Sequence, residues 1–301
     1  MSSIKLAPAQ EPTGGVKHIT PLLLPRLNQH YQVRASRLVQ LAEGHAMGDY
    51  LKFTAGIAAA QQRLLDTFPL PDSANARLEL IDGQAPLDHA RLHRDPYWQQ
   101  VLGCLIEELR PNASPEAQAV LDELGDSSSQ QLEQLADSLL AGDFAQVGSG
   151  RALFLWSALS LYWAQLAARL PLEASAELGE QRQFCPVCAG SPSASVVLGG
   201  DQSGLRYLHC GLCESRWHMV RVKCSNCEEG DKLDYWSLET KDAPLKAESC
   251  SHCMSYLKLL YLDRANYQEV FADDLASLAL DAEVEREGFA RSGLNPLLFP
   301  G

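Results

Sequence analysis

The sequence predicts an α+β, multidomain fold, in which an α-helical N-terminal domain is followed by two small cysteine-rich modules and a C-terminal helix. Residues 19–172 are rich in Ala and Leu, hold one cysteine and repeat their apolar residues at helical spacing. Residues 184–262 hold the other eight cysteines, which short runs of β-prone residues separate. A chain of 301 residues also exceeds the length at which one core usually keeps growing, so more than one domain is expected.

The helical domain is expected to span residues 19–175. Clusters of proline, glycine and small polar residues divide its apolar pattern into separate segments, because such residues interrupt helices. The helices predicted between these breaks cover residues 30–45, 49–67, 96–109, 115–124, 130–141 and 150–169.

Residues 153–170 form an apolar stretch whose length approaches that of a membrane-spanning helix. Three polar side chains interrupt the stretch, namely Ser157, Ser160 and Gln165. The apolar residues recur at helical spacing, as they do in a helix that other helices surround. We therefore expect a buried helix and no membrane insertion.

Residues 1–18 are predicted to be a disordered lead-in to the folded chain. They hold two prolines and a Gly-Gly pair, and they have no apolar run of signal-peptide length. A cytoplasmic protein is expected for this reason. The formal net charge of −13 argues against binding to nucleic acid, which requires a surplus of Lys and Arg.

Eight of the nine cysteines fall in four Cys-x-x-Cys pairs. The pairs are Cys185/Cys188, Cys210/Cys213, Cys224/Cys227 and Cys250/Cys253. Two thiolates at this spacing can bind one metal ion from a tight turn, and two such turns complete a tetrahedral four-sulfur site. Disulfides are the alternative, but a chain of this size does not need them for stability. The sequence therefore predicts two bound metal ions.

The spacing of the pairs predicts which of them share a metal. Twenty-one residues separate Cys188 from Cys210 and twenty-two separate Cys227 from Cys250, but only ten separate Cys213 from Cys224. The matching long gaps indicate a duplicated module, each copy of which closes its own site. The predicted sites are Cys185, Cys188, Cys210 and Cys213 for the first metal, and Cys224, Cys227, Cys250 and Cys253 for the second. Interleaved pairing is the alternative.

The two modules are predicted to span residues 183–222 and 223–264, with residues 265–301 forming a C-terminal helix and tail. The β-prone runs in the modules cover residues 195–198, 206–209, 217–222, 234–238 and 256–262. The C-terminal helix is expected over residues 272–288, and residues 295–300 are expected to pack back on the body of the protein.

Four-sulfur tetrahedral sites suit both zinc and iron, so the sequence does not separate the two metals. We favour iron because none of the predicted ligands is a histidine. Metal that only stabilises small modules remains one interpretation of these sites. A role in redox chemistry or in sensing a partner is the other.

Other reactive residues are assigned structural roles. His89 and His93 are expected on a solvated helix face, and Cys104 is expected to be a small buried side chain. Asp273 and Asp274 are expected to cap the start of the C-terminal helix. No catalytic triad, phosphate loop or dinucleotide fingerprint occurs in the sequence, so we predict no catalytic residue and no enzyme activity.

Four aromatic residues lie in the predicted hairpins, namely Tyr207, Trp217, Tyr235 and Trp236. They could form an exposed aromatic surface. Aromatic side chains on hairpins usually pack against neighbouring structure, so we expect them to lie between the ribbons.

Several stretches resemble the family of the formate dehydrogenase accessory protein FdhE. These stretches cover residues 184–192, 206–217, 224–227, 247–258 and 272–281, together with Arg291, Asn295 and Pro296 and, in the helical half, residues 95–98. All four cysteine pairs of that family are present. The resemblance implies two rubredoxin-like or zinc-ribbon modules that carry iron centres.

The resemblance also implies a cytoplasmic maturation factor that is required to make active formate dehydrogenase. Such a factor would bind the catalytic subunit of that enzyme before export. The alternative is a rubredoxin-like one-electron carrier or a redox-sensing protein. A nucleic-acid-binding zinc ribbon is disfavoured by the acidity of the chain.

Overall fold

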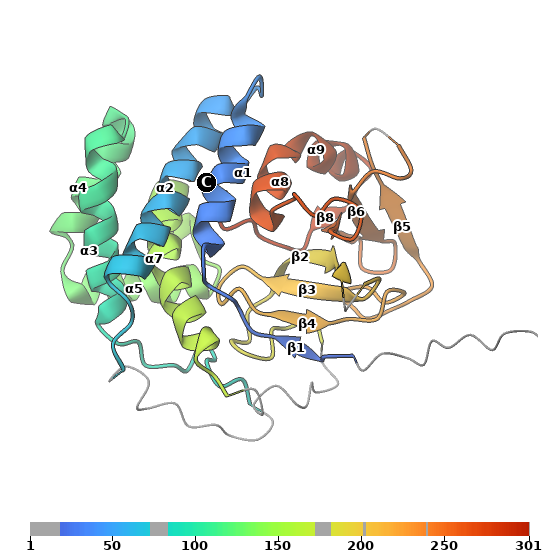
Figure 1. The fold of residues 1–301 in the computed structure, drawn as a ribbon, viewed down its shortest axis with the longest axis horizontal. Helices are drawn as coiled ribbons and strands as arrows, with labels where there is room; N and C mark the ends of the chain where they lie inside the picture. The colour runs from blue at the N-terminus through green and yellow to red at the C-terminus, as the bar shows by residue number, and fades with distance from the viewer. Residues whose placement is uncertain (1–18, 73–83, 172–181, 201–202, 239, 301) are drawn as a thin grey trace, which may run out of the picture.

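The computed structural model describes residues 19–72, 84–171, 182–200, 203–238 and 240–300. A group of helices lies beside a twisted sheet, and two further helices cover one face of that sheet (Figure 1). The fold is therefore of the mixed α and β class that the sequence predicts. The expected lead-in, residues 1–18, lies outside the described residues.

The N-terminal half is helical, as predicted. Its helices are α1 (His30–Ala42), α2 (Gly48–Thr67), α3 (Tyr97–Leu109), α4 (Pro115–Asp126), α5 (Ser129–Leu140), α6 (Phe144–Val147) and α7 (Ser149–Ala168), with a 3-10 turn, η2 (Arg110–Asn112), after α3. All six expected helices are present, and their ends differ by up to three residues. The four-residue α6 was not predicted, because a segment this short shows no helical periodicity.

Helix α7 is the buried centre of the helical half. Its neighbours cover it almost completely, and its polar residues are hydrogen-bonded inside the bundle. Gln61 Nε2 donates to the Ser157 carbonyl oxygen over 2.9 Å, and Gln165 Oε1 accepts from the Leu70 amide over 2.8 Å. Within the described ranges, no helix combines the length and the apolar character that a membrane span requires.

One mixed sheet holds all the strands of the described chain. The strands are β1 (Leu22–Leu23), β2 (Pro192–Val197), β3 (Arg206–Cys210), β4 (Arg216–His218), β5 (Leu233–Trp236), β6 (Leu245–Cys250), β7 (Ser255–Tyr261) and β8 (Ala290–Arg291). Their order is β1-β4-β3-β2-β7-β6-β5, and β8 pairs with β7. The β6 strand was not among the predicted runs, since its sequence mixes Lys, Glu and Ser with few β-prone residues.

The two cysteine-rich segments are joined through strands β2 and β7. These strands pair in parallel, with Ser195 opposite Leu259, so the two sets of hairpins form one continuous sheet. Strand β1 forms one edge of the sheet, where its Leu22 pairs with Trp217 of β4. Neither contact was predicted, because both depend on residues far apart in the sequence.

The C-terminal helix is divided into α8 (Val270–Ala276) and α9 (Leu278–Arg286), which lie on one face of the sheet (Figure 1). The predicted single helix over residues 272–288 is therefore wrong in its continuity. The chain leaves helical geometry at Ser277, where φ is −111°. The buried Lys258 explains the break, because its Nζ donates to Ser277 Oγ over 2.9 Å and to the Asp274 carbonyl oxygen over 2.7 Å.

The cap of α8 is Glu269 and not the predicted Asp273–Asp274 pair. Glu269 Oε2 accepts hydrogen bonds from the amides of Phe271 and Ala272 over 3.1 and 2.9 Å. The Asp273 carboxylate accepts from the Glu269 amide and pairs with Arg37 of α1. Asp274 is fully buried and pairs with Lys258 and Arg291.

The C-terminal tail packs on the body of the protein, as predicted. Asn295 Nδ2 donates to the Phe271 carbonyl oxygen and to Asp274 Oδ2 over 3.0 and 2.7 Å. Phe299 is only 6% exposed, and its ring lies 5.4 Å from that of Trp156 in α7. The tail therefore bridges α8 and helix α7 of the helical half.

Candidate metal centres

The structure gathers the eight paired cysteines into two groups of four. Cys185, Cys188, Cys210 and Cys213 form the first centre, and Cys224, Cys227, Cys250 and Cys253 form the second. Within each centre, every sulfur lies within 4.8 Å of the other three. The two groups are those that the spacing of the pairs predicts.

Three of the four cysteine pairs sit on the same hydrogen-bonded turn. The amide of the first cysteine donates to the carbonyl oxygen five residues later, from Cys185 to Gly190, Cys210 to Ser215 and Cys224 to Glu229, over 2.8, 3.0 and 2.8 Å. The amide of the residue after the second cysteine donates back to the first cysteine's carbonyl oxygen over 2.8 to 3.1 Å. In the fourth turn, Cys250 pairs with Ser255 in the β6–β7 hairpin.

All four turns place a residue other than glycine in the left-handed region. Ala189, Glu214, Glu228 and Met254 each follow the second cysteine of a pair, with φ of 60°, 59°, 62° and 53°. An L-residue loses about 1–2 kcal/mol in this conformation, so the turn must be stabilised by its other contacts. A metal ion bound by the cysteine sulfurs would provide such a contact in each turn.

The distances between sulfurs fit a tetrahedral site. The Sγ–Sγ separations of Cys185–Cys213 and Cys188–Cys210 are 3.5 and 3.4 Å in the first centre. Those of Cys224–Cys253 and Cys227–Cys250 are 3.8 and 3.7 Å in the second. Tetrahedral metal–sulfur bonds of about 2.3 Å place the sulfurs about 3.8 Å apart. Each group can therefore hold one metal ion.

A backbone amide donates to a cysteine sulfur in one turn of each centre. The Leu212 amide donates to Cys210 Sγ, and the Asn226 amide donates to Cys224 Sγ, each over 3.4 Å. Hydrogen bonds of this kind spread the negative charge of a thiolate that binds a metal. The close packing continues at Gly190, where an added Cβ would lie 3.4 Å from Cys188 Sγ.

Two thiols of the first centre, those of Cys185 and Cys188, resist ionisation. Burial raises the pKa values of Cys185 and Cys188 well above the ordinary value, and contacts with Cys210 and Cys213 raise both further. Hydrogen bonds from the other three cysteines lower the pKa of Cys210 well below its ordinary value. A metal ion at the centre would stabilise all four thiolates, which the thiols alone do not.

The two centres differ in their exposure. All four cysteines of the first centre are at most 1% exposed. In the second centre Cys224 and Cys250 are buried, whereas Cys227 and Cys253 are partly exposed. Burial alone raises the pKa of Cys253, but hydrogen bonds from Ser255 and Asn226 outweigh it and lower the pKa to about 6. The second centre is therefore the more accessible one.

The helical half contacts the first centre through backbone hydrogen bonds. The Leu87 and His89 amides donate to the Val187 and Cys188 carbonyl oxygens over 2.8 and 3.0 Å. Trp156 Nε1 of α7 donates to the Gly211 carbonyl oxygen over 3.0 Å. The prediction that His89 lies on a helix is wrong, because residues 87–95 form turns and irregular structure beside this centre.

A buried ion-pair cluster joins the first centre to α1 and α8. Glu214, next to Cys213, accepts from Arg34 Nη1 and contacts His209 Nε2, each over 2.9 Å. Burial would raise the pKa of Glu214, but Arg34 and His30 hold it well below its ordinary value. Arg34 also donates to Glu269, the cap of α8, over 2.9 Å. Sequence reasoning missed this cluster, because Arg34, Glu214 and Glu269 lie more than 50 residues from one another in the sequence.

The remaining aromatic and cysteine predictions have mixed outcomes. Tyr207 and Trp217 are fully buried, and Trp217 Nε1 donates to the Arg182 carbonyl oxygen over 2.7 Å. Tyr235 is 47% exposed, so the expectation that it packs between ribbons is wrong. Cys104 is partly buried and packs on the helical core, away from both centres.

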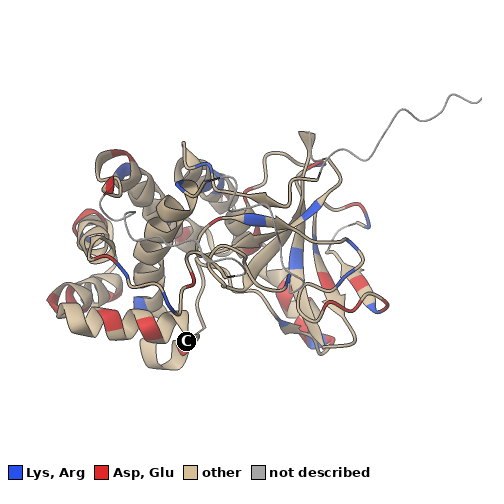
Figure 2. Ribbon diagram, turned by 90° about the horizontal axis from the view of Figure 1, so that it is seen from below, with Lys and Arg blue, Asp and Glu red and all other residues tan. Residues whose placement is uncertain are grey.

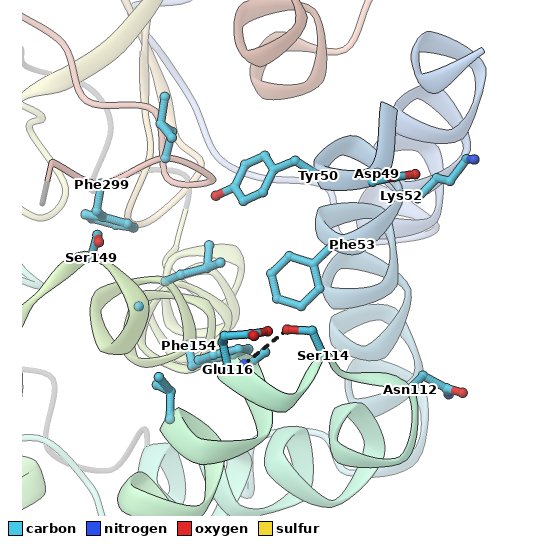
Figure 3. Close-up of a pocket in the computed structure, with 15 residues that line it drawn as sticks. Asp49, Tyr50, Lys52, Phe53, Asn112, Ser114, Glu116, Ser149, Phe154 and Phe299 are labelled. Atoms are coloured by element: carbon cyan, nitrogen blue, oxygen red, sulfur yellow. Dashed lines mark hydrogen bonds between the residues drawn. The ribbon is translucent and has the colours of Figure 1, made fainter. Parts of the chain in front are cut away.

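A separate cleft of about 850 Å³ lies between α2, α4, α7 and the tail (Figure 3). Phe53, Phe154 and Phe299 give it a largely apolar lining. The hydroxyl oxygen of Ser114 accepts from the Ala117 amide and caps α4. The carboxylate of Glu116 lies beside it at the exposed rim (Figure 3).

Comparison with known proteins gives a consistent family match. The models of the FdhE N-terminal, central and C-terminal domains match residues 19–180, 184–221 and 222–298. The chain is 52% identical to Protein FdhE of Salmonella typhimurium and to Protein FdhE of Escherichia coli O157:H7, over 99% of each chain. It also resembles the crystal structure of the FdhE protein from Pseudomonas aeruginosa, with a TM-score of 0.85 and 38% identity. That match covers 93% of this chain and 99% of the other.

Proposed function

The chain belongs to the FdhE family, and from this premise we propose that it is an accessory factor for the assembly of formate dehydrogenase. In this role it binds the catalytic subunit of that enzyme in the cytoplasm, before export, and it performs no catalysis of its own. The observation that carries the proposal is the pair of four-cysteine centres, built on pre-organised turns within a chain of this family.

The eight cysteines are the proposed metal ligands, four to each ion. Iron is favoured, and zinc has the same geometry and ligand preference in such a site. A bound ion would supply charge compensation for four thiolates and, if it is iron, one exchangeable electron. The protein contributes the fixed turns, the amide hydrogen bonds to sulfur and, at the first centre, exclusion of water.

Two structural features favour a binding role for the metal modules. The first centre is tied to α7, α1 and α8, so a metal there fixes the position of the helices relative to the sheet. The second centre lies at the surface, with Cys227 and Cys253 partly exposed. A partner that docks beside the second centre would therefore be sensitive to whether its metal is bound.

An anaerobic binding experiment tests the proposal. The tagged protein is used to capture purified formate dehydrogenase catalytic subunit, and wild type is compared with Cys185→Ser and Cys250→Ser. Cys104→Ser is the matched control, because Cys104 is the one cysteine outside the two centres. We expect capture by wild type and the control, and weaker capture by the two centre variants, with circular dichroism showing that the helices remain folded.

Equal capture by wild type and all three variants would show that the metal modules are not needed for binding the subunit. No capture by folded, metal-loaded wild type would reject the accessory function itself. The metal is identified separately by elemental analysis of protein purified without oxygen. Two iron or two zinc ions per chain, reduced to one in each centre variant, are expected.

One-electron transfer is the second candidate function. The partial exposure of Cys227 and Cys253 favours it, because an exposed centre can exchange electrons with a partner. Reversible reduction of the iron-loaded protein, together with electron transfer to an acceptor in the absence of any formate dehydrogenase subunit, would support this candidate over the accessory role.

A further inference from the structure

The sheet has one face on β5, β6 and β7 that points away from helix α9. Trp236, Ala247 and Tyr256 pack against α9. Because side chains alternate along a strand, the neighbouring residues point to the opposite face. These residues are Tyr235 on β5, Lys246 and Glu248 on β6, and Leu257, Leu259 and Tyr261 on β7.

Two cations lie over the Tyr261 ring on this opposite face, and a third belongs to the adjacent loop. The Arg264 guanidinium lies 4.3 Å and the Lys246 ammonium 5.4 Å from the centroid of the Tyr261 ring. Arg221 lies on the adjacent loop, where Arg206 Nη1 donates to the carbonyl oxygens of Val220 and Lys223. Burial raises the pKa of Tyr261, and the positive charges of Arg264 and Arg221 oppose this rise. We name Arg221, Lys246, Arg264 and Tyr261 the cationic face.

The one acidic side chain among these strand residues is already neutralised. Glu248 is 4% exposed, and its Oε1 accepts from Arg206 Nη2 over 2.6 Å. Arg221, Lys246 and Arg264 form no ion pair with any carboxylate that the structure describes. These three cations are therefore without a carboxylate partner among the described residues, although the formal net charge of the chain is −13 and its sheet half carries Asp and Glu as well as Lys and Arg (Figure 2).

Exposed apolar side chains border the cationic face. Arg206 Nη1 donates to the carbonyl oxygens of Val220 and Lys223 over 3.4 and 2.8 Å, which fixes this loop beside the sheet. Val220 is 43% and Val222 65% exposed, on either side of Arg221 in the sequence. A surface that combines exposed aliphatic groups with unpaired cations is typical of a protein-binding site.

We propose that the cationic face, with Val220 and Val222 at its border, docks an acidic segment of a protein partner. The inference rests on the proposed function, under which the partner is the formate dehydrogenase catalytic subunit. Charge complementarity selects an acidic partner, and the aliphatic border selects one that also offers apolar side chains. Nucleic acid fits this surface less well, because it offers no apolar groups for Val220 and Val222 to cover.

Charge reversal tests the proposal in the full-length, metal-loaded protein. The affinity for the purified catalytic subunit is measured for wild type, for Arg221→Glu/Arg264→Glu and for the matched double variant Arg26→Glu/Lys52→Glu. Arg26 and Lys52 are exposed and, among the described residues, also lack an ion pair, so the control has the same net charge but leaves the cationic face intact. The neutral variant Arg221→Gln/Arg264→Gln removes the same two positive charges without adding carboxylates. It therefore separates the loss of charge from any misfolding that the new Glu residues cause.

At low salt we expect the Glu double variant to lose affinity by about tenfold or more, with a smaller loss for the Gln variant and little for the control. The affinity of wild type should fall as salt is raised, and that of the Glu variant should change less. Equal binding by wild type and the Glu variant would overturn the surface while leaving the proposed function intact. A loss in the control, whose Lys52 borders the cleft of Figure 3, would also overturn it.

If wild type does not bind the subunit, the proposed function is rejected. A second experiment then tests the docking surface without the subunit. A dye-labelled synthetic peptide that alternates Asp or Glu with Leu is titrated against the same proteins. Binding by wild type and control, lost in the Glu variant, would support the docking surface on its own. No binding of the peptide, or binding that an oligonucleotide of equal charge displaces more strongly than the peptide itself, would overturn it.

Discussion

Replacement of Lys258 by Met removes the cation at the centre of the most buried ion-pair cluster. The Lys258 side chain is 0% exposed, and its Nζ lies 3.0 Å from Asp274 Oδ1 and 2.5 Å from Asp281 Oδ2. Met has a similar shape and keeps the apolar stem, so the substitution removes the charge without opening a large cavity. Among the described residues, Arg291 is then the one cation that still pairs with these two carboxylates.

The magnitude follows from this imbalance. Removal of one partner from a buried ion pair leaves an uncompensated charge and costs about 3–5 kcal/mol. The Asp274 carbonyl oxygen and Ser277 Oγ also lose a hydrogen bond each. We therefore expect Lys258→Met to lower the free energy of unfolding by about 3–5 kcal/mol, with α8 and α9 the first elements to loosen.

Urea denaturation followed by circular dichroism measures the loss, and hydrogen exchange locates it. Lys52→Met is the matched control, because Lys52 is exposed and its charge has no described ion-pair partner. The control should change stability by no more than about 0.5 kcal/mol. Addition of Asp274→Asn to Lys258→Met should restore part of the loss, because it removes the uncompensated charge.

The loss should also depend on pH. Burial would raise the pKa of Asp274, but Lys258 and Arg291 lower it below the ordinary value of 3.8. A carboxyl with a lowered folded-state pKa stabilises the protein above its unfolded pKa, and this contribution is lost as the pH falls through the folded value. The gap between wild type and Lys258→Met should thus narrow below about pH 4. A stability loss under 1 kcal/mol, or a gap that widens in acid, would refute the reasoning.

Three further predictions follow from the same structure. Arg34→Ala should lower the free energy of unfolding by about 3–5 kcal/mol, because it leaves the buried Glu214 and Glu269 without their main cation. The control Arg63→Ala, at an exposed ion pair, should lower it by at most about 1 kcal/mol in the same urea titration. Gly56→Ala should raise the free energy of unfolding by about 0.5–1 kcal/mol, since nothing lies within 4 Å of the added Cβ in this helix; no rise in the thermal midpoint would contradict it. A chelator should remove metal from the second centre first, and thiol labelling followed by mass spectrometry should find Cys227 and Cys253 modified before any cysteine of the first centre.

The parts of the fold that sequence predicted are those that local patterns determine. Apolar periodicity and proline breaks were sufficient to place α1, α2, α3, α4, α5 and α7. The four cysteine pairs predicted both groups of sulfurs, because each group depends on a short turn and on one gap of 21 or 22 residues. Each of these features is complete within a stretch of about 30 residues or fewer.

The parts that were missed depend on contacts between distant residues. The division of the C-terminal helix at Ser277 is caused by Lys258, which lies on a strand. The parallel contact between β2 and β7 has no local signal, because either strand could have remained the edge of its own hairpin. The link from Arg34 to Glu214 joins residues 180 positions apart. Burial and charge at these positions are visible only once the chain is folded.

The pairing of β1 with β4 affects how the chain matures during synthesis. Leu22 is made 195 residues before its partner Trp217, and α1 is made long before α8, against which it packs. At about 5–20 residues per second, the ribosome takes roughly 10 to 40 s to travel from one strand to the other. During that interval the part of α1 that packs against α8 and the edge of β1 lack their native neighbours. The nascent N-terminal segment is therefore exposed to proteases and to aggregation until the cysteine-rich half has emerged.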